Sequence, residues 1–434
     1  MRKMRDSGNM WIGATPETWK MIPLKYLASY NDEVLSENTD DEFEFDYIEI
    51  GSVQYGRGII YTEHMKFKNA PSRARRIVRK DDIIVSTVRT YLKAVATIPA
   101  CNNSLIASTG FIVIRPHKVL PRFMNYALLS ESFISLVESH STGISYPAIN
   151  SVDVVKFKIP VPCRSEQERI AAFLDAECAE IDAVLEKTRA SIEEYKKLKQ
   201  AVITQAVTKG IRGDRPMKDS GIEWIGDIPA EWSVVKGRRL ILATQNGLTR
   251  RNLEKSEGFI VLKLKNLDAD GNIDYSEVNR VALTDEEKSK YQLCDGDFLF
   301  VRVNGSRNLV GKCAIYHDVG EIVAYNDHII RVKLNDLCLK EYFHYYLLSI
   351  AGKREIELHT STAAGQFTIS GDGLRELRVV LPGIVEQAET VAYLDKKSAD
   401  IDALVAKKQQ YLTEIENYKK SLIYEYVTGK KEIV

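Results

Sequence analysis

The sequence predicts an α+β protein made of two tandem copies of one unit, each a globular body followed by a long helix. The segment DSGNMWIGATPETW (6–19) recurs as DSGIEWIGDIPAEW (219–232), at an offset of 213 residues. The segment VPCRSEQERIAAFLDAECAEIDAVLEK (161–187) recurs as LPGIVEQAETVAYLDKKSADIDALVAK (381–407), at an offset of 220. The chain therefore contains an internal repeat of about 215 residues.

The repeat divides the chain into four parts. The offset of 220 also matches Tyr126-Ala127-Leu128 with Tyr346-Leu347-Leu348, which extends the second match backwards into the bodies. We call residues 4–19 and 217–232, which begin the two copies, the tags. The expected parts are a first body at 1–160 with its tag at 4–19, a first long helix at 161–212, a second body at 213–380 with its tag at 217–232, and a second long helix at 381–434.

The bodies show short apolar runs that are typical of strands and are separated by Gly, Asp and Asn turns. The runs are FDYIEIGSV, DIIVSTVR and STGFIVIRP in the first body, and GFIVLKLKNL, DFLFVRV and HIIRVKL in the second. A short helix is expected near 121–138 and another near 340–357. The turns at Asp82 and Asp297 correspond, but the loops around them do not, which indicates one scaffold with two different surfaces.

Each long segment has apolar residues spaced three or four apart, which is the pattern of a helix with a heptad seam. Ser165 and Glu168 suggest a capping box at the first start, and Gly210 and Gly429 mark the two ends. About 45 residues give a rod of about 60 Å. We expect the two rods to form an antiparallel coiled coil, with a helix lying on its own body, or a coiled coil between copies of the chain, as the alternatives. The predicted seam residues are Ile181, Leu185, Ile192, Tyr195, Val202, Ile401, Val405, Leu412, Ile415 and Leu422.

Antiparallel pairing would give the chain a pseudo-twofold axis. The first helix runs on through the tag at 217–232 into the second body, whereas no tag follows the second helix before Val434. Residues 4–19 are then expected beside the end of the second helix, as residues 217–232 lie beside the end of the first. The tag is interpreted as a joint that is used once in each half.

Composition gives few further constraints. Sixty basic residues balance sixty acidic ones, so nucleic-acid binding would depend on local basic faces. The six cysteines form no C-x-x-C pair, so we expect reduced, mostly buried thiols and no metal site. No apolar run approaches a membrane span and no signal peptide begins the sequence, which predicts a cytoplasmic protein without a membrane partner. The seven histidines show no ligand spacing and are interpreted as structural.

Two different heads on a rod with near-twofold symmetry suit a ligand that is long and nearly dyadic, and double-stranded DNA has both properties. Specific contacts need Arg or Lys for guanine and Asn or Gln for adenine, with further basic residues for phosphates. A solvated surface is the alternative for each candidate, and core packing is the alternative for Phe367. The candidates are Arg73, Arg75, Arg76, Arg89, Thr90, Tyr91, Lys93, Tyr146, Arg250, Arg251, Arg302, Asn304, Ser306, Arg307, Lys312 and Gln366.

The order and twofold use of three motifs resemble the specificity subunit of type I restriction-modification systems. They are W-I-G-x-x-P-x-x-W in each tag, E-Q-x-x-I-A-x-F-L-D at 166–175, and E-Q followed by Y-L-D at 386–395. The second copy departs slightly, with VVLP in place of IPVP. The resemblance implies that each body is a target recognition domain that reads half of a bipartite DNA sequence, with the coiled coil spanning the unread spacer.

The resemblance also implies partners. Two modification subunits would dock on the helices and tags and use S-adenosylmethionine, and restriction subunits using ATP and Mg would join in the full complex. This chain would carry no cofactor and no catalytic residue. The sequence agrees, since it lacks an N-P-P-Y-type motif, G-x-G-x-x-G, a P-loop and H-E-x-x-H. The alternatives are a coiled-coil scaffold with two heads that do not bind DNA, and a nuclease or methyltransferase with unfamiliar motifs.

Overall fold

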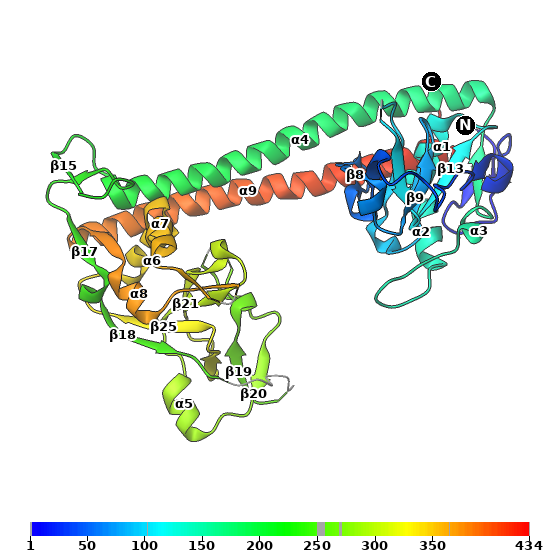
Figure 1. Ribbon diagram of the computed structural model, residues 1–434. Coiled ribbons are helices and arrows are strands. Elements are labelled where there is room, and N and C mark those ends of the chain that lie inside the picture. Colours follow the sequence, from blue (N-terminus) through cyan, green and yellow to red (C-terminus); the bar gives the residue numbers. More distant parts are fainter. Residues whose placement is uncertain (1, 102, 250–256, 269–270, 364, 434) are drawn as a thin grey trace. The chain divides into compact units, whose positions relative to one another are not determined.

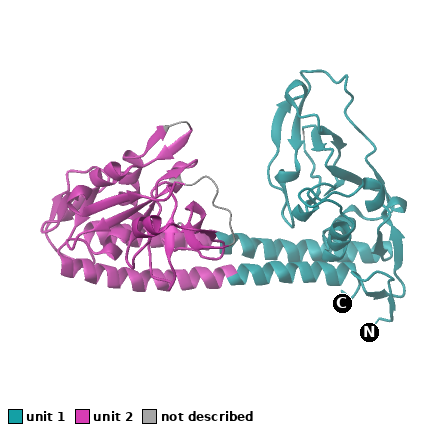
Figure 2. Cartoon of the chain, turned by 90° about the horizontal axis from the view of Figure 1, so that it is seen from below, with its two compact units in different colours: residues 1–189, 410–434 teal, residues 190–409 magenta. Residues whose placement is uncertain are grey.

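The structure, a computed structural model, describes residues 2–101, 103–249, 257–268, 271–363 and 365–433. The chain forms two compact units, one of residues 1–189 with 410–434 and one of residues 190–409 (Figure 2). Two long helices, α4 (Arg164–Lys209) and α9 (Ile384–Val427), each contribute to both units. Unit 1 is therefore discontinuous in sequence, because it combines the first body with the C-terminal part of α9.

Unit 1, whose strands are drawn in blue to cyan in Figure 1, contains two four-stranded sheets. One is antiparallel, with the order β11 (Val95–Thr97), β10 (Ile83–Ser86), β13 (Phe111–Pro116), β4 (Ala28–Tyr30). The other has the order β8 (Glu63–Lys66), β5 (Glu44–Ile48), β12 (Leu105–Ser108), β9 (Ala74–Val78), with β5 and β12 parallel. The smaller elements are β1 (Met4–Asp6), β2 (Ala14–Pro16), β3 (Lys20–Pro23), β6 (Val53–Gln54), β7 (Gly58–Ile59), β14 (Lys158–Val161), α1 (Pro121–Leu129), α2 (Glu131–Ser139), α3 (Ser151–Val154), η1 (Leu24–Tyr26), η2 (Ile50–Ser52), η3 (Phe67–Asn69) and η4 (Thr90–Leu92).

Unit 2 repeats much of this topology. Its antiparallel sheet has the order β23 (Cys313–Ile315), β21 (Phe298–Val301), β25 (Ile329–Leu334), β18 (Ile241–Asn246). A second sheet has the order β20 (Asn279–Val281), β19 (Phe259–Leu262), β24 (Val323–Tyr325), with β19 and β24 parallel. The other elements are β15 (Met217–Asp219), β16 (Asp227–Pro229), β17 (Ser233–Lys236), β22 (Val303–Asn304), β26 (Ser361–Ala363), β27 (Gln366–Thr368), β28 (Arg378–Leu381), α5 (Asp285–Tyr291), α6 (Lys340–Leu348), α7 (Ile350–Leu358), α8 (Gly371–Glu376), η5 (Gly237–Arg239), η6 (Leu264–Asn266) and η7 (Arg307–Leu309).

Apolar strands in the middle of each antiparallel sheet form the cores. In unit 1, β10 and β13 supply Ile84, Phe111 and Val113 to one buried cluster. In unit 2, β21 and β25 supply Phe298 and Ile330 to another. These strands are runs of β-branched and aromatic residues, which favour an extended chain that is covered on both faces. The predicted strands at 82–89, 108–116, 297–303 and 328–334 are thereby confirmed.

The turn before each central strand holds a matching buried carboxylate. Asp82 accepts a hydrogen bond from the backbone NH of Arg79 and pairs with Arg115 at 2.8 Å. Asp297 accepts from the backbone NH of Cys294 and pairs with Arg331 at 3.4 Å. The hydrogen bonds and charge of Asp82 raise the pKa of Arg115. The predicted correspondence of the two Asp turns is confirmed.

The long helices have no proline or glycine in their interiors, which explains their length. Gly210 directly follows α4 and Gly429 lies two residues beyond α9, with φ of 80° and 73°, so each takes the left-handed conformation that commonly ends a helix. All the predicted seam residues are buried or half-buried. No helix in the described part of the chain is both long and apolar enough to cross a bilayer.

Within each unit, segments of α4 and α9 run antiparallel. In unit 1, Asp182 pairs with Lys419 at 2.6 Å and Arg189 pairs with Glu416 at 2.6 Å. The partner number falls as the α4 number rises, which defines the direction. In unit 2, Tyr195 lies under the ammonium of Lys408 at 5.6 Å, and Lys199 pairs with Asp402 at 2.7 Å.

The tags form a joint in each unit. Trp19 is 1% exposed and its indole NH donates to Glu166 at the start of α4, at 3.0 Å, while Arg2 pairs with the same carboxylate at 2.5 Å. At the C-terminal end of α9, Tyr424 and Lys430 both donate to the carbonyl of Ile12. The predicted position of residues 4–19 beside the end of the second helix is confirmed.

The joint of unit 2 repeats that of unit 1. The indole NH of Trp232 donates to Glu386 at 2.7 Å, and Arg215 pairs with Glu386 at 2.5 Å. A Cβ on Gly210 would come within 3.2 Å of Trp232, and one on Gly429 would come equally close to Trp19. Each joint therefore packs a tag against the start of one long helix and the end of the other, as the interpretation of the tag requires.

Three details of the prediction were wrong. The capping box at Ser165 and Glu168 is displaced, because α4 already begins at Arg164 and the carbonyl of Cys163 accepts the first helical bond from Gln167. Each predicted short helix is two helices of nine residues, which meet at Ser130 and Ser349. The thiols are not mostly buried, since Cys101, Cys163 and Cys294 are exposed and only Cys178, Cys313 and Cys338 are buried.

The match of Tyr126 with Tyr346 was also wrong, by one residue. Tyr126 donates to Asp175 of α4, and its counterpart Tyr345 donates to the equivalent Asp395 of α9, at 2.8 and 2.7 Å. Burial and the bond to Asp175 raise the pKa of Tyr126. The offset therefore changes from 220 in the helices to 219 here, which a gapless comparison of short strings does not detect.

Candidate nucleic-acid interface

The first candidate site consists of two adjacent loops, residues 87–93 and 141–149. The first loop follows β10 and turns through η4, with Arg89 and Lys93 both at φ of 52°. Left-handed backbone costs a non-glycine residue about 1–2 kcal/mol, and such strain is often found at binding sites. The turn leaves Arg89 and Tyr91 exposed, with Tyr91 at 52%.

Hydrogen bonds hold the second loop against the first. Ala148 forms bridges with both Val88 and Thr142, and the NH of Ile149 donates to the carbonyl of Thr87 at 2.8 Å. The guanidinium of Arg89 lies 5.3 Å from the centre of the Tyr146 ring, which is an attractive cation–π distance. The fold thus brings together predicted residues that lie more than fifty positions apart.

Not every predicted residue of this site can reach a ligand. Thr90 is 3% exposed, and its hydroxyl donates to that of Ser141 at 2.9 Å, so Thr90 joins the two loops. Lys93 is half-buried and its ammonium lies 3.3 Å from Glu138. Arg89, Tyr91 and Tyr146 therefore form the accessible part of the predicted set.

Four arginines on and beside β9, three of them predicted as candidates, differ in how far they are free to bind a ligand. Arg73 is exposed, and its carbonyl accepts from Thr109, one residue before the glycine whose carbonyl bonds Thr87 of the first loop. Arg75 stacks on Phe67 at 4.8 Å, and Arg79 pairs with Glu33 at 2.7 Å. Burial lowers the pKa of Arg76, whose Nε has no hydrogen-bond partner. Arg73 is thus the freest of the four for a phosphate.

The second candidate site consists of residues 302–307 and 366–369 in unit 2. Strand β22 pairs with β27, which places Asn304 opposite Phe367. Gln366 is exposed and Phe367 is half-buried. The Asn304 side chain accepts the NH of Ser306, so the amide is held near the exposed Ser306 and Gly305.

The remaining predicted residues of unit 2 differ in how far their side chains are free to contact a ligand. Arg302 donates to the carbonyl of Asp327, and Arg307 donates to that of Glu357, both at 3.3 Å. Lys312 is half-buried beyond the loop. Arg250 and Arg251, also predicted here, lie outside the described residues.

The two candidate sites share the same pattern of backbone pairing. In unit 1 the residue Ala148 bridges Val88 on one side and Thr142 on the other. In unit 2 the residue Thr368 pairs with Val303 and Ser361 in the same way. Counting outward from these pairs, Arg89 corresponds to Asn304 and Tyr146 to Gln366. The same two positions therefore present a guanidinium and a phenol in one unit and two carboxamides in the other.

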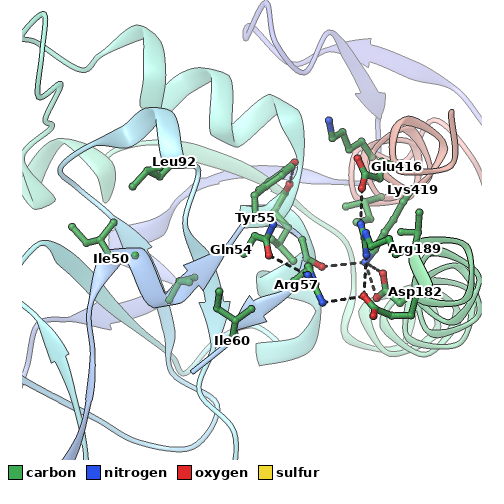
Figure 3. Close-up of a pocket in the computed structure, with 18 residues that line it drawn as sticks. Ile50, Gln54, Tyr55, Arg57, Ile60, Leu92, Asp182, Arg189, Glu416 and Lys419 are labelled. Atoms are coloured by element: carbon green, nitrogen blue, oxygen red, sulfur yellow. Dashed lines mark hydrogen bonds and ion pairs between the residues drawn. The ribbon is translucent and has the colours of Figure 1, made fainter. Parts of the chain in front are cut away.

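A hairpin mounts the first body on the helix pair of unit 1 (Figure 3). The turn between β6 and β7 brings Arg57 to Glu186 of α4 at 2.9 Å, and Lys419 of α9 donates to the carbonyl of Gly56 at 3.2 Å. These contacts border a cleft of about 750 Å³ between the body and the helices. The charged groups labelled in Figure 3 are already in ion pairs, among them Arg189 with Glu416 and Asp182 with Lys419, which suits a structural contact.

The described residues contain no group of three or more His, Cys, Asp or Glu side chains able to hold a metal ion. His344 of α6 packs edge-on against Phe298, with the two ring centres 6.0 Å apart. Burial lowers the pKa of His344 to about 4, and its Nε2 has no hydrogen-bond partner. A neutral imidazole in an aromatic core fits the structural role that the sequence suggested.

The family model of the type I restriction modification DNA specificity domain matches residues 16–194 and 253–414, which together cover most of the chain. The chain belongs to this family. It is a specificity subunit of a type I restriction-modification system, a component that recognises DNA and is not itself an enzyme. The resemblance found in the tags and helix starts is thus confirmed.

Individual relatives match nearly the whole chain. The specificity subunit of the type I restriction enzyme EcoKI from Escherichia coli K12 is 24% identical, over 97% of this chain and 91% of its own length. That of StySPI from Salmonella potsdam is 25% identical, over 96% and 90%. A chain solved in work on complex assembly and conformational transition of the type I R-M system superposes with a TM-score of 0.70 at 21% identity, over 96% of this chain and 99% of that one. This likeness supports the mixed α/β fold.

Sequence reasoning missed several residues of this specificity subunit. Ile144 is fully exposed on the second loop of the first candidate site, although its type usually indicates a core residue. Nothing in the sequence distinguishes the turn between β6 and β7, which carries Arg57, from an ordinary turn. The pairing of Arg2 and Arg215 with the joint carboxylates had one available signal, because the two arginines lie at the same offset of 213 as the tags.

Proposed function

We propose that the two candidate sites each read one half of a bipartite duplex sequence. The main support is that the matching backbone pairing in the two sites presents different side chains at equivalent positions. Arg89 suits the O6 and N7 acceptors of guanine, and Asn304 and Gln366 suit adenine, which offers N7 and N6. The halves would then differ in sequence although the two bodies share a scaffold.

The basic residues around these sites would set the register on the backbone without reading bases. Arg73 in unit 1 and Arg307 in unit 2 are exposed beside the two sites. Their charges are local, since the chain as a whole has 60 basic and 60 acidic residues. Binding would therefore depend on salt through a few contacts on each body.

The antiparallel segments of α4 and α9 would form one coiled coil that fixes the length of the unread spacer. The support is the burial of the seam residues and the ion pairs Arg189 with Glu416 and Lys199 with Asp402. An aromatic contact between Phe173 and Tyr426, with centroids 4.5 Å apart, adds to it in unit 1. The domain limits of 1–160, 161–212, 213–380 and 381–434 are proposed on the same basis.

The helices and tags would also dock two modification subunits, in which S-adenosylmethionine would supply the methyl group for adenine. Restriction subunits using ATP and Mg would complete the complex. The two joints support a pair of equivalent docking places, because Glu166 and Glu386 hold their tags through the same contacts. The chain itself would bring sequence recognition to that assembly.

The test is DNA binding by the chain assembled with its modification subunit, measured at several salt concentrations. We expect tight binding to one duplex sequence over scrambled duplexes, with log K falling linearly as log salt rises. The control exchanges residues 20–160 for the first body of another specificity subunit and should change the preferred sequence in one half only. Absence of salt-dependent binding would support a scaffold whose heads bind other ligands, and a change in both halves would overturn the modular reading.

A further inference from the structure

The most exposed large apolar side chain in the described part of the protein is Ile144, whose relative accessibility is 102%. Burying an isoleucine is worth about 1.5–3 kcal/mol, so full exposure is a cost that a folded loop would normally avoid. Tyr146, two residues on, is 67% exposed, and Tyr91 of the neighbouring loop is 52% exposed. An isolated surface isoleucine is ordinary, but this one lies in an apolar group within a candidate binding site.

The loop that carries Ile144 is closed at its base. Thr142 and Ala148 exchange two backbone hydrogen bonds of 2.9 Å, which leaves only five residues, 143–147, in the loop. Gly143 has φ of 108°, and a Cβ there would lie 3.1 Å from the carbonyl oxygen of Tyr146, so the turn is tight. The backbone therefore holds Ile144 outward in a fixed place, which reduces the entropy lost on binding.

The residues around the loop indicate which ligand would accept the apolar side chain of Ile144. The guanidinium of Arg89 lies over Tyr146, and Arg89 and Tyr91 are exposed beside it. A partner for this surface has to combine negative charge with flat apolar faces, and a stack of base pairs between two phosphate backbones has both. Proteins that insert an apolar wedge between base steps unstack and kink the duplex there.

We propose that Ile144 is a wedge that enters between two base pairs of the first half-site, with Tyr146 and Arg89 supporting the opened step. This inference rests on the proposed function, because it assigns the mode of binding at the same site. The equivalent positions of the second unit carry no large apolar residue, since residues 363–366 read Ala, Ala, Gly and Gln. The first half-site is therefore opened by an apolar side chain and the second is not, so the two halves also differ in DNA shape.

The experiment uses the chain assembled with its modification subunit and duplexes that contain the target sequence with 2-aminopurine at successive positions. The parent complex should raise the fluorescence at one step of the first half-site, where stacking is lost. Ile144→Ala should abolish that rise and weaken binding on the order of tenfold, as the loss of buried apolar surface predicts. Ile144→Leu should retain both, and an abasic site at the opened step should restore the affinity of Ile144→Ala.

The matched control is Val152→Ala, which removes an aliphatic side chain that is 55% exposed in the same unit but outside the loop. It should leave fluorescence and affinity unchanged. A parent complex that binds its target without a rise at any first-half position, or an Ile144→Ala complex that binds as Val152→Ala does, overturns the wedge and leaves the reading function intact. Failure of the parent complex to bind duplex DNA overturns the proposed function itself.

Discussion

Single side chains at equivalent positions distinguish the two candidate sites. Residue chemistry alone predicted Arg89, Tyr146, Asn304 and Gln366 as candidates, and the fold places them in two matching frames. The same chemistry could not separate Thr90, which is buried in the loop junction, from its exposed neighbours. Ile144 could not be found, because an apolar residue in a sequence predicts burial unless the loop around it is known.

Substitutions at the equivalent positions should affect one half-site each. We expect Arg89→Ala to relax the preference within the first half by about 1–3 kcal/mol, because a bidentate contact to a base is lost, and Asn304→Ala to do the same in the second half. The measurement is the methylation rate of the assembled complex on duplexes that vary at each position. Lys156→Ala, which removes an exposed charge that pairs with Asp153, is the control and should leave both halves unchanged.

His344 should make stability depend on pH. Burial lowers its pKa to about 4 from 6.5, so the unfolded chain binds the proton first as pH falls. The stabilisation is therefore complete above pH 6.5 and is lost as the pH falls towards 4, by about 2 kcal/mol after allowance for partial solvent contact.

Urea unfolding at pH 7.5 and 4.5 measures this effect as the difference between the parent and His344→Phe. The variant should lose less free energy of unfolding between the two pH values. His317→Phe, at a ring that is 74% exposed, should behave like the parent. Equal pH dependence in the parent and His344→Phe would contradict the assignment.

At the scale of elements, periodicity predicted the long helices well, because 46 residues in α4 and 44 in α9 without a helix-breaking residue leave few alternatives. Short elements were predicted less well. Ser130 and Ser349 interrupt each short helix after nine residues, and one serine in an otherwise helical pattern is a weak sequence signal for a break. The helix start at Arg164 was missed because the residue before it, Cys163, is not one of the usual N-cap residues Ser, Thr, Asp or Asn.

The joint carboxylate Glu386 should matter more than its exposed neighbours on the same helix. Glu386→Ala removes the carboxylate that pairs with Arg215 where the two side chains are 10% and 11% exposed, so that Arg215 keeps only its pair with the exposed Glu231. It also removes the acceptor of Trp232. We expect a loss of about 3 kcal/mol in the free energy of unfolding of unit 2. Glu389→Ala breaks an exposed pair with Arg212 and should cost less than about 1 kcal/mol. Equal losses in the two variants, measured by chemical denaturation, would show that the joint is not the stabilising element.

At the scale of the whole molecule, the internal repeat carried most of the prediction. Two matched segments identified two halves, and the unpaired tag at 4–19 predicted where the second helix ends, beside Ile12. Which bases are read is not predictable from either repeat, because the loops that differ between the halves follow no shared pattern. Those loops are where the two bodies depart from one another.

Helix length should set the spacer. Inserting one heptad into α4 after Arg189 and one into α9 after Gln409 keeps the seam in register and lengthens each helix by about 10 Å. The recognised sequence should retain both halves and gain roughly 3 bp between them. Sequencing of methylated DNA from cells that carry the variant measures the gap, and an unchanged spacer would show that the helices do not set it.

The central claim is that two recognition bodies contact two half-sites at a fixed separation. The most direct test is a map of methylated adenines in the genome of cells that express this chain with its modification subunit. The map should show two short specified sequences separated by an unspecified run of constant length, with an adenine methylated in each. A single continuous sequence, or two halves at variable separation, would contradict the account.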